Sequence, residues 1–217
     1  MVLAFPLPQP RSPLDDGDRS PDPQGCAQWY GTSLGWATAG SDPVQLLTGL
    51  RFDVLELPAD AGFAVLRRIP VTGPVALAGR RMRLLVAAGS ADELPGLLDW
   101  LEWGSVPLEL TALGTGGLIT APVPPSWPGS QGAAVWLRPP EPGHEVEPTL
   151  PAFHGFGGIG GTGGNTGRGE RESTPDLVRL VDTAATECHR ARLLRCAGVA
   201  GRTDCADRTK SQPLACS

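Results

Sequence analysis

The sequence predicts an α+β fold, in which an antiparallel sheet carries helices on one face. The first observation is the order of the periodic segments between residues 52 and 121, which read β-α-β-β-α-β and are followed by one more strand. This is the order of the split, ferredoxin-like unit. The second observation is composition: 41% of the 217 residues are hydrophobic, enough for one modest core, and the 29 Gly and 23 Pro are clustered. We therefore expect one folded domain with irregular flanking segments.

The N-terminal part is predicted to consist of a disordered segment followed by two short helices. Residues 1–24 are rich in Pro and Asp and contain no periodic apolar residues, so they are expected to be disordered. The α+β domain is predicted over residues 25–138. It begins with a short helix over residues 26–35, and an Asp-Pro pair predicts a second helix over residues 42–47. Both helices are expected to cover one edge of the core.

The first half of the β-α-β-β-α-β unit is defined by short apolar runs and the breakers between them. The predicted elements are a strand (52–57), a helix (59–68) and two hairpin strands (75–78 and 82–87). Pro58 ends the first strand, and residues 79–81 form a tight turn within the hairpin.

The second half opens with the clearest local signal in the chain. Ser90 and Glu93 match a capping box, in which a hydroxyl and a carboxylate satisfy free amides at a helix start. The buried stripe of this helix is expected at Leu94, Leu97, Leu98 and Leu101, and Gly104 is expected to end it. Three strands should follow, at residues 106–113, 118–121 and, at the sheet edge, 134–137.

The C-terminal third is predicted to be a linker, a helix and a tail. Residues 139–173 are rich in Pro and Gly and read as a flexible linker. Residues 174–197 form an amphipathic helix that Thr174 and Pro175 begin, and residues 198–217 form a polar tail that contains cysteines. The apolar stripe of this helix must pack on either the core or another protein, and it includes Leu177, Leu180, Val181, Ala184 and Cys188.

Two carboxylates on the first core strand suggest a divalent-metal site. Asp53 and Glu56 are three residues apart, however, and side chains alternate between the faces of a strand, so these two are expected to point to opposite sides. Strand-end charges that are solvated or paired with Arg are the favoured interpretation. None of the three histidines lies in the core unit. We therefore assign no catalytic, cofactor-binding or metal-binding residue, and no cofactor.

Charge and hydropathy narrow the classes of partner. The net charge of −5 disfavours general binding to nucleic acid, although residues 177–210 hold seven basic and four acidic side chains. No apolar run is long enough to span a bilayer, and the N-terminus makes a poor signal peptide, so a cytoplasmic location is expected. Trp100 and Trp103 are candidate partner contacts, with core packing as the alternative.

Several segments resemble the small Streptomyces proteins labelled as primase/polymerase N-terminal domain-like. The matching segments are Phe52–Pro58, Thr72–Ala76, Arg83–Ala87, Leu97–Gly104, Ala121–Pro125 and Trp136–Pro140. The resemblance implies a primase-like fold and a regulator of morphological differentiation, active in aerial mycelium formation and sporulation. The family pattern also implies an acidic pair, a hairpin histidine and a further acidic residue, but this chain has Met82 and Arg83 where the histidine is expected.

Three functional hypotheses follow. The first is a non-enzymatic regulator that contacts an unknown protein partner through the Trp-bearing surface or the C-terminal helix. The second is a nucleotidyltransferase or nucleotide-binding domain that uses Asp53, Glu56 and Glu109 with Mg²⁺ or Mn²⁺. The third is a DNA-binding regulator that uses the basic C-terminal helix, which the overall acidity disfavours.

Overall fold

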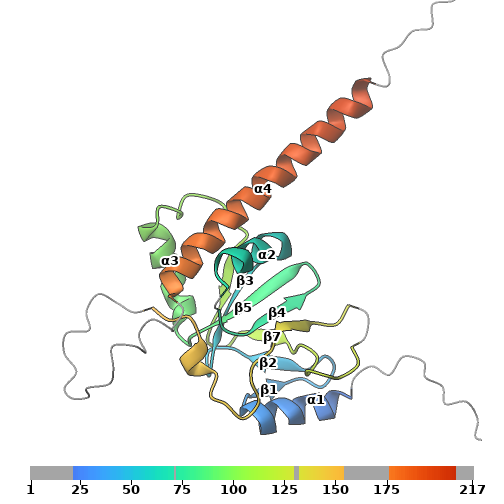
Figure 1. The fold of residues 1–217 in the computed structure, drawn as a ribbon, viewed down its shortest axis with the longest axis vertical. Coiled ribbons are helices and arrows are strands. Elements are labelled where there is room, and N and C mark those ends of the chain that lie inside the picture. Colours follow the sequence, from blue (N-terminus) through green and yellow to red (C-terminus); the bar gives the residue numbers. More distant parts are fainter. Residues whose placement is uncertain (1–21, 71, 130–131, 154–175, 209–217) are drawn as a thin grey trace, which may run out of the picture.

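Five antiparallel strands form the main sheet in the spatial order β6-β3-β5-β4-β8, of which Figure 1 labels β3, β5 and β4. The computed structural model describes residues 22–70, 72–129, 132–153 and 176–208. The strands are β3 (Asp53–Pro58), β4 (Val75–Ala78), β5 (Arg81–Val86), β6 (Thr111–Leu113) and β8 (Val135–Arg138). The first four strands in this order have the ferredoxin-like arrangement, and β8 extends the sheet beside β4. The predicted α+β class is confirmed.

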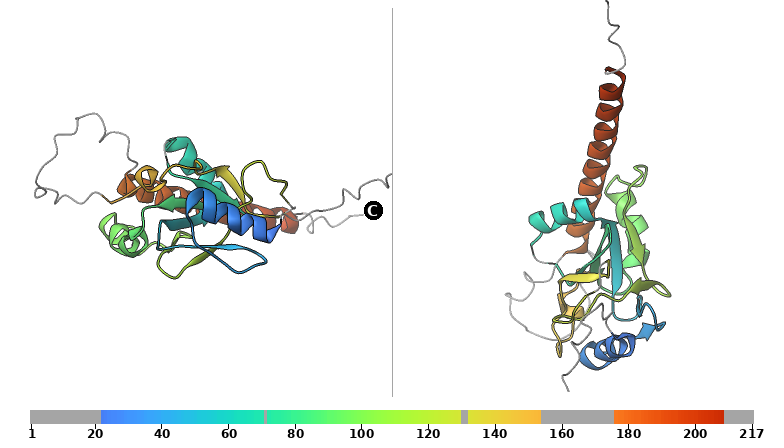
Figure 2. Two further views of the ribbon diagram at one scale, coloured as in Figure 1. Left: turned by 90° about the horizontal axis from the view of Figure 1, so that it is seen from below. Right: turned by 90° about the vertical axis from the view of Figure 1, so that its right-hand side faces the viewer.

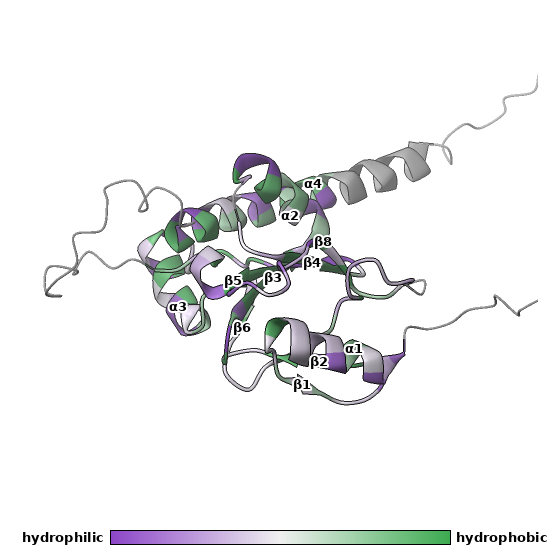
Figure 3. Cartoon of the chain, turned by 60° about the horizontal axis from the view of Figure 1, so that its bottom comes forward, coloured by the Kyte–Doolittle hydropathy of each residue, from purple (hydrophilic) through white to green (hydrophobic). Residues whose placement is uncertain are grey.

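Three helices cover one face of the main sheet. They are α2 (Ala59–Arg68), α3 (Ser90–Trp100) and α4 (Leu177–Arg208). Because side chains alternate along β3, Leu55 and Leu57 both point into this helical layer and are fully buried there. Figure 3 shows the hydrophobic residues of the central strands beneath α2 and α4. This layer holds the larger of the two apolar cores.

A second apolar core lies on the opposite face, and the sequence did not predict what covers it. A small sheet of β1 (Thr38–Ala39), β2 (Gln45–Leu47) and β7 (Leu118–Thr120) is accompanied by α1 (Pro23–Trp29) and the two short helices η1 (Tyr30–Leu34) and η2 (Glu147–Thr149). The Tyr30 hydroxyl donates to the Pro122 carbonyl oxygen at 2.7 Å and accepts the Trp136 indole N–H at 2.9 Å. Trp36 and Phe52 pack against one another in the same cluster. The N-terminal segment therefore completes the domain.

Helix α4, with 32 residues, is the longest helix in the described part of the chain. Its first part packs on α2 and α3, and its last part continues past the rest of the folded chain (Figures 1 and 2). The predicted helix ends at residue 197, whereas the observed helix continues to Arg208 and so includes the first part of the predicted polar tail. At its start, the Asp176 carboxylate accepts the Val178 amide at 2.9 Å and caps the helix.

Other segment predictions are corrected by the structure. Residues 45–47 form strand β2 rather than a helix, because Val44 and Leu46 are buried while Gln45 is less so, which is the period of a strand. Residues 139–153 are part of the domain rather than a linker, since Val146 and Leu150 are buried in the second core.

Several boundaries also differ. Helix α1 begins at Pro23, two residues before the predicted start of the domain at residue 25, and Asp22 caps it. Helix α3 ends at Trp100 rather than near Gly104, and β6 is confined to residues 111–113. The predictions for residues 1–21, for residues 154–175, which include the Thr174 and Pro175 start signal, and for residues 209–217 lie outside the described residues.

Gly62 sets the distance between α2 and the sheet. A Cβ atom at this position would lie 2.8 Å from the Cβ of Met82 on β5 and closer still to its sulfur. We expect Gly62→Ala to lower the free energy of unfolding by about 1–3 kcal/mol, because overpacking outweighs the gain in helix propensity.

Gly96 is the matched control, because an added Cβ there meets no atom within 4 Å. Gly96→Ala should therefore stabilise the protein by up to about 1 kcal/mol. Urea denaturation of both variants measures the difference. A stabilising Gly62→Ala would show that α2 does not pack on β5 as closely as described.

Candidate functional site

Asp53 caps a helix instead of facing its neighbouring carboxylate. It is 1% exposed, and its Oδ2 accepts the Ala91 amide at 2.8 Å, at the start of α3. The predicted capping box at Ser90 is wrong, because Ser90 is the first residue of the helix and Gly89, with φ +91°, stands at the cap position without a side chain. The cap comes from a strand nearly forty residues earlier in the chain. The other Asp53 oxygen is buried without a hydrogen-bond partner in the described residues.

Glu56 lies on the opposite face of β3, as the alternation of the strand predicts. Its two carboxylate oxygens accept the Nε–H groups of Arg81 at 3.0 Å and Arg83 at 2.9 Å. Burial raises the pKa of Glu56, but the hydrogen bonds and charges of the two arginines outweigh this effect and hold the pKa below its ordinary value. Glu56 is thus an ion-paired strand residue, as the favoured interpretation expects.

The three carboxylates of the metal hypothesis do not converge. Glu109 precedes β6 and pairs with Arg195 of α4 at 2.7 Å, while Asp53 and Glu56 occupy the two faces of the sheet. Among the residues that the structure describes, no group of three or more His, Cys, Asp or Glu side chains is placed to hold a metal ion. Each carboxylate instead has a structural partner.

The Glu56 ion pairs predict a pH-dependent contribution to stability. We expect Glu56→Gln to lower the free energy of unfolding by about 1–2 kcal/mol at pH 7, because it leaves two arginines without their counter-charge. A carboxyl whose folded pKa is depressed stabilises the protein above its unfolded pKa and loses this effect as the pH falls through the folded value. The difference between wild type and variant should therefore shrink as the pH falls from the ordinary value of 4.5. Urea denaturation at pH 7 and pH 3 tests this, and an equal difference at both pH values would contradict it.

The two candidate tryptophans have different surroundings. Trp100, at the end of α3, is 65% exposed. Trp103 is partly buried: its indole N–H donates to Asp182 of α4 at 3.2 Å, and its ring lies 5.9 Å from that of His189. Trp103 therefore joins the end of α3 to α4, and Trp100 alone remains at the surface.

The candidate stripe on α4 belongs to the protein's own core. The sequence left open whether this stripe packs on the core or on another protein, and the structure shows that it packs on the core. Each of its side chains is at most 2% exposed, and α4 contacts β3, α2 and α3. The five residues are Leu177, Leu180, Val181, Ala184 and Cys188. They are not available to a partner of the folded protein. Burial also raises the pKa of Cys188 to about 12, so this thiol stays protonated.

A groove between α2 and α4 was not predicted from the sequence. It has a volume of about 770 Å³, and we call it the arginine groove because Arg67, Arg80 and Arg190 stand along it. A second hollow of about 520 Å³ adjoins it beside Phe63 and shares the lining residues Asp60, Arg80 and Arg195. The sequence contains one sign of an exposed apolar surface on α4. Leu193 and Leu194 do not continue the helical spacing of the buried stripe.

Arg195 marks the point at which α4 leaves the domain. Its guanidinium binds Asp60 of α2 at 2.8 Å and Glu109 at 2.7 Å. One turn earlier, Arg192 donates to the Pro107 carbonyl oxygen at 2.7 Å. Leu193 and Leu194 lie between these two arginines and are 56% and 67% exposed. An apolar pair is thus presented where the helix separates from the fold.

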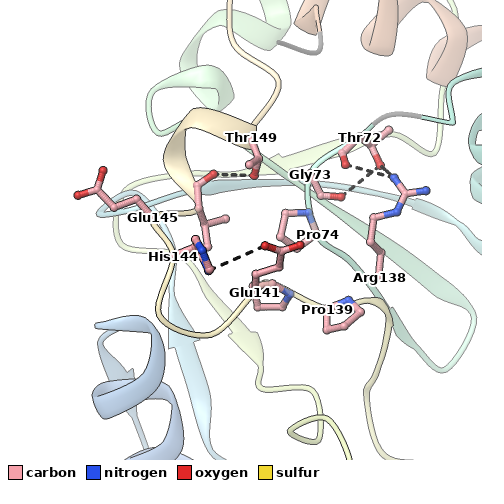
Figure 4. A pocket seen from close by; sticks show the side chains of 11 residues that line it. Thr72, Gly73, Pro74, Arg138, Pro139, Glu141, His144, Glu145 and Thr149 are labelled. Carbon is pink, nitrogen blue, oxygen red and sulfur yellow. Dashed lines mark hydrogen bonds and ion pairs between the residues drawn. The ribbon is translucent and has the colours of Figure 1, made fainter. Parts of the chain in front are cut away.

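A smaller hollow of about 200 Å³ lies at the other end of the sheet (Figure 4). Arg138 forms one side, and its Nη1 donates to the carbonyl and hydroxyl oxygens of Thr72 at 3.2 and 2.6 Å. His144 and Glu141 form another side and lie 3.9 Å apart, both largely exposed. Because Arg138 is hydrogen-bonded to Thr72, we interpret this hollow as the place where residues 139–150 pack against the edge of the sheet.

Comparisons with protein-family models, with curated proteins and with solved structures found no match for this chain. Within the ranges that the structure describes, no helix is both long enough and apolar enough to cross a membrane.

Proposed function

We propose that the protein is a non-enzymatic regulator that acts through contacts with another protein. The observation that carries this proposal is α4, which projects beyond the domain and exposes Leu194, on the arginine groove, and its chain neighbour Leu193. Exposed apolar patches mark many protein-binding surfaces, and Arg is enriched in such surfaces. The structural roles of Asp53 and Glu56 also favour a scaffold over a catalyst.

The resemblance to the Streptomyces primase/polymerase-like proteins supplies the biological setting of this proposal. Within that group, the chain looks most like the aerial-mycelium-formation protein, a regulator of morphological differentiation. We therefore propose a cytoplasmic role in aerial mycelium formation and sporulation in a Streptomyces-like actinobacterium. The missing hairpin histidine, where the chain has Met82 and Arg83, supports a primase-like scaffold that has lost its chemistry.

Complementation of a deletion strain tests this proposal. The wild-type gene should restore aerial growth, and the double variant Leu193→Glu and Leu194→Glu should not, because it places two charges on the proposed contact surface. Leu50→Glu is the matched control, since Leu50 is 61% exposed and lies far along the chain from α4. Thermal unfolding should show that both variants remain folded. Full aerial growth with the folded double variant would contradict a role for this surface.

A further inference from the structure

The arginine groove carries positive charge that its own carboxylates do not neutralise. Asp60 pairs with Arg195, and Glu187, which is 3% exposed, pairs with Arg68 at 2.8 Å. The three exposed arginines along the groove form no ion pair within the described part of the chain; they are Arg67, Arg80 and Arg190. On a protein of net charge −5, such a group marks a local site for an acidic ligand.

The groove also has an apolar component that a polyanion alone would not use. Leu194, which is 67% exposed, lies along its wall, and Phe63, which is 42% exposed, lines the adjoining hollow. Ala61, Ala64 and Ala191 also line the groove, and their small side chains leave room for a ligand. A ligand with both aliphatic and acidic side chains fits better than nucleic acid.

The projecting part of α4 suggests that such a ligand would lie along the axis of this helix. Beyond the ion pair of Arg195 with Asp60 of α2, the helix continues to Arg208, which is about 20 Å at 1.5 Å per residue. A second helix seated in the groove could continue alongside this projecting segment. A short loop would occupy only the groove itself.

We propose that the arginine groove binds an acidic amphipathic helix of a partner protein. The aliphatic face of that helix would cover Leu194 and Phe63, and its carboxylates would pair with Arg67, Arg80 and Arg190. This inference rests on the proposed function and adds the chemistry of the partner. It is the helix-in-groove mode of recognition, with charge complementarity that sets orientation.

A displayed library of helical peptides tests this inference on the full-length chain. One helical face of the library varies between Leu and Ala, and the flanking positions vary among Glu, Ser and Lys. Peptides with Leu on the face and Glu beside it should be enriched. Their affinity should fall about tenfold or more in the triple variant Arg67→Glu, Arg80→Glu and Arg190→Glu, and less in the corresponding Gln variant. Arg179→Glu, at an exposed position elsewhere on α4, should leave the affinity unchanged.

Three results of the peptide experiment would overturn the inference. These are enrichment without acidic residues, an affinity that the folded Gln and Glu variants leave unchanged, and an absence of enriched peptides. A fourth is binding of a 20-base-pair DNA duplex that the triple variant abolishes, which would assign the groove to nucleic acid. The proposed function is separable: if the Leu193 and Leu194 variant fails to restore aerial growth but the triple arginine variant succeeds, the regulator proposal stands and the acidic-helix proposal fails.

Discussion

Leu180→Ala should destabilise the protein by about 2–5 kcal/mol, the cost of a large cavity in a packed core. Leu180 is 1% exposed and lies in the layer formed by α2, α3 and β3. The loss is expected because the surrounding helices cannot close fully around the missing side chain. Chemical denaturation of the two proteins, followed by tryptophan fluorescence, measures it.

Leu193→Ala is the control on the same helix. Leu193 is 56% exposed, so its truncation should change the free energy of unfolding by no more than about 0.5 kcal/mol. If Leu180→Ala instead left stability unchanged and weakened partner binding, the first part of α4 would be a detachable interaction helix rather than part of the domain.

The second large effect is expected at Asp53. Asp53→Ala removes the cap of α3 and leaves a buried cavity, so it should cost about 2 kcal/mol. Asp53→Asn should cost much less, since the amide oxygen can accept the Ala91 N–H and Asn caps helices as well as Asp does. The pair of variants separates a cap, which tolerates Asn, from a metal ligand, which requires the carboxylate charge.

Denaturation of the two Asp53 variants provides the measurement. Similar losses for Ala and Asn would mean that the negative charge of Asp53 matters in the folded protein. Binding of Mn²⁺ to the wild type that is lost in Asp53→Asn would support the metal hypothesis over the cap.

The sequence predicted the central sheet well because its signals are local. Apolar runs and the breakers Pro58 and Gly79 define β3, α2 and the β4–β5 hairpin, and strand alternation alone placed Asp53 and Glu56 on opposite faces. The helical spacing of the apolar residues also predicted the buried stripe of α4. It did not predict whether the core or a partner protein would cover that stripe.

The rest depended on contacts between residues distant in the chain. The capping box at Ser90 was a sound local pattern, but Asp53 reaches the amides of α3 from the sheet and replaces it. Residues 139–153 have a linker-like composition, yet two apolar side chains four residues apart, Val146 and Leu150, suffice to anchor them. The arginine groove likewise forms from α2, the β4–β5 turn and α4, which no single segment reveals.

We propose that the outer surface of α4, and not the carboxylates of β3, performs the function. The most direct measurement compares Asp53→Asn with the Leu193→Glu and Leu194→Glu double variant in the same complementation assay, with both proteins shown to be folded at wild-type levels. We predict that Asp53→Asn restores aerial growth and the double variant does not. The opposite result, growth with the double variant and none with Asp53→Asn, would contradict the claim and favour a carboxylate-dependent activity.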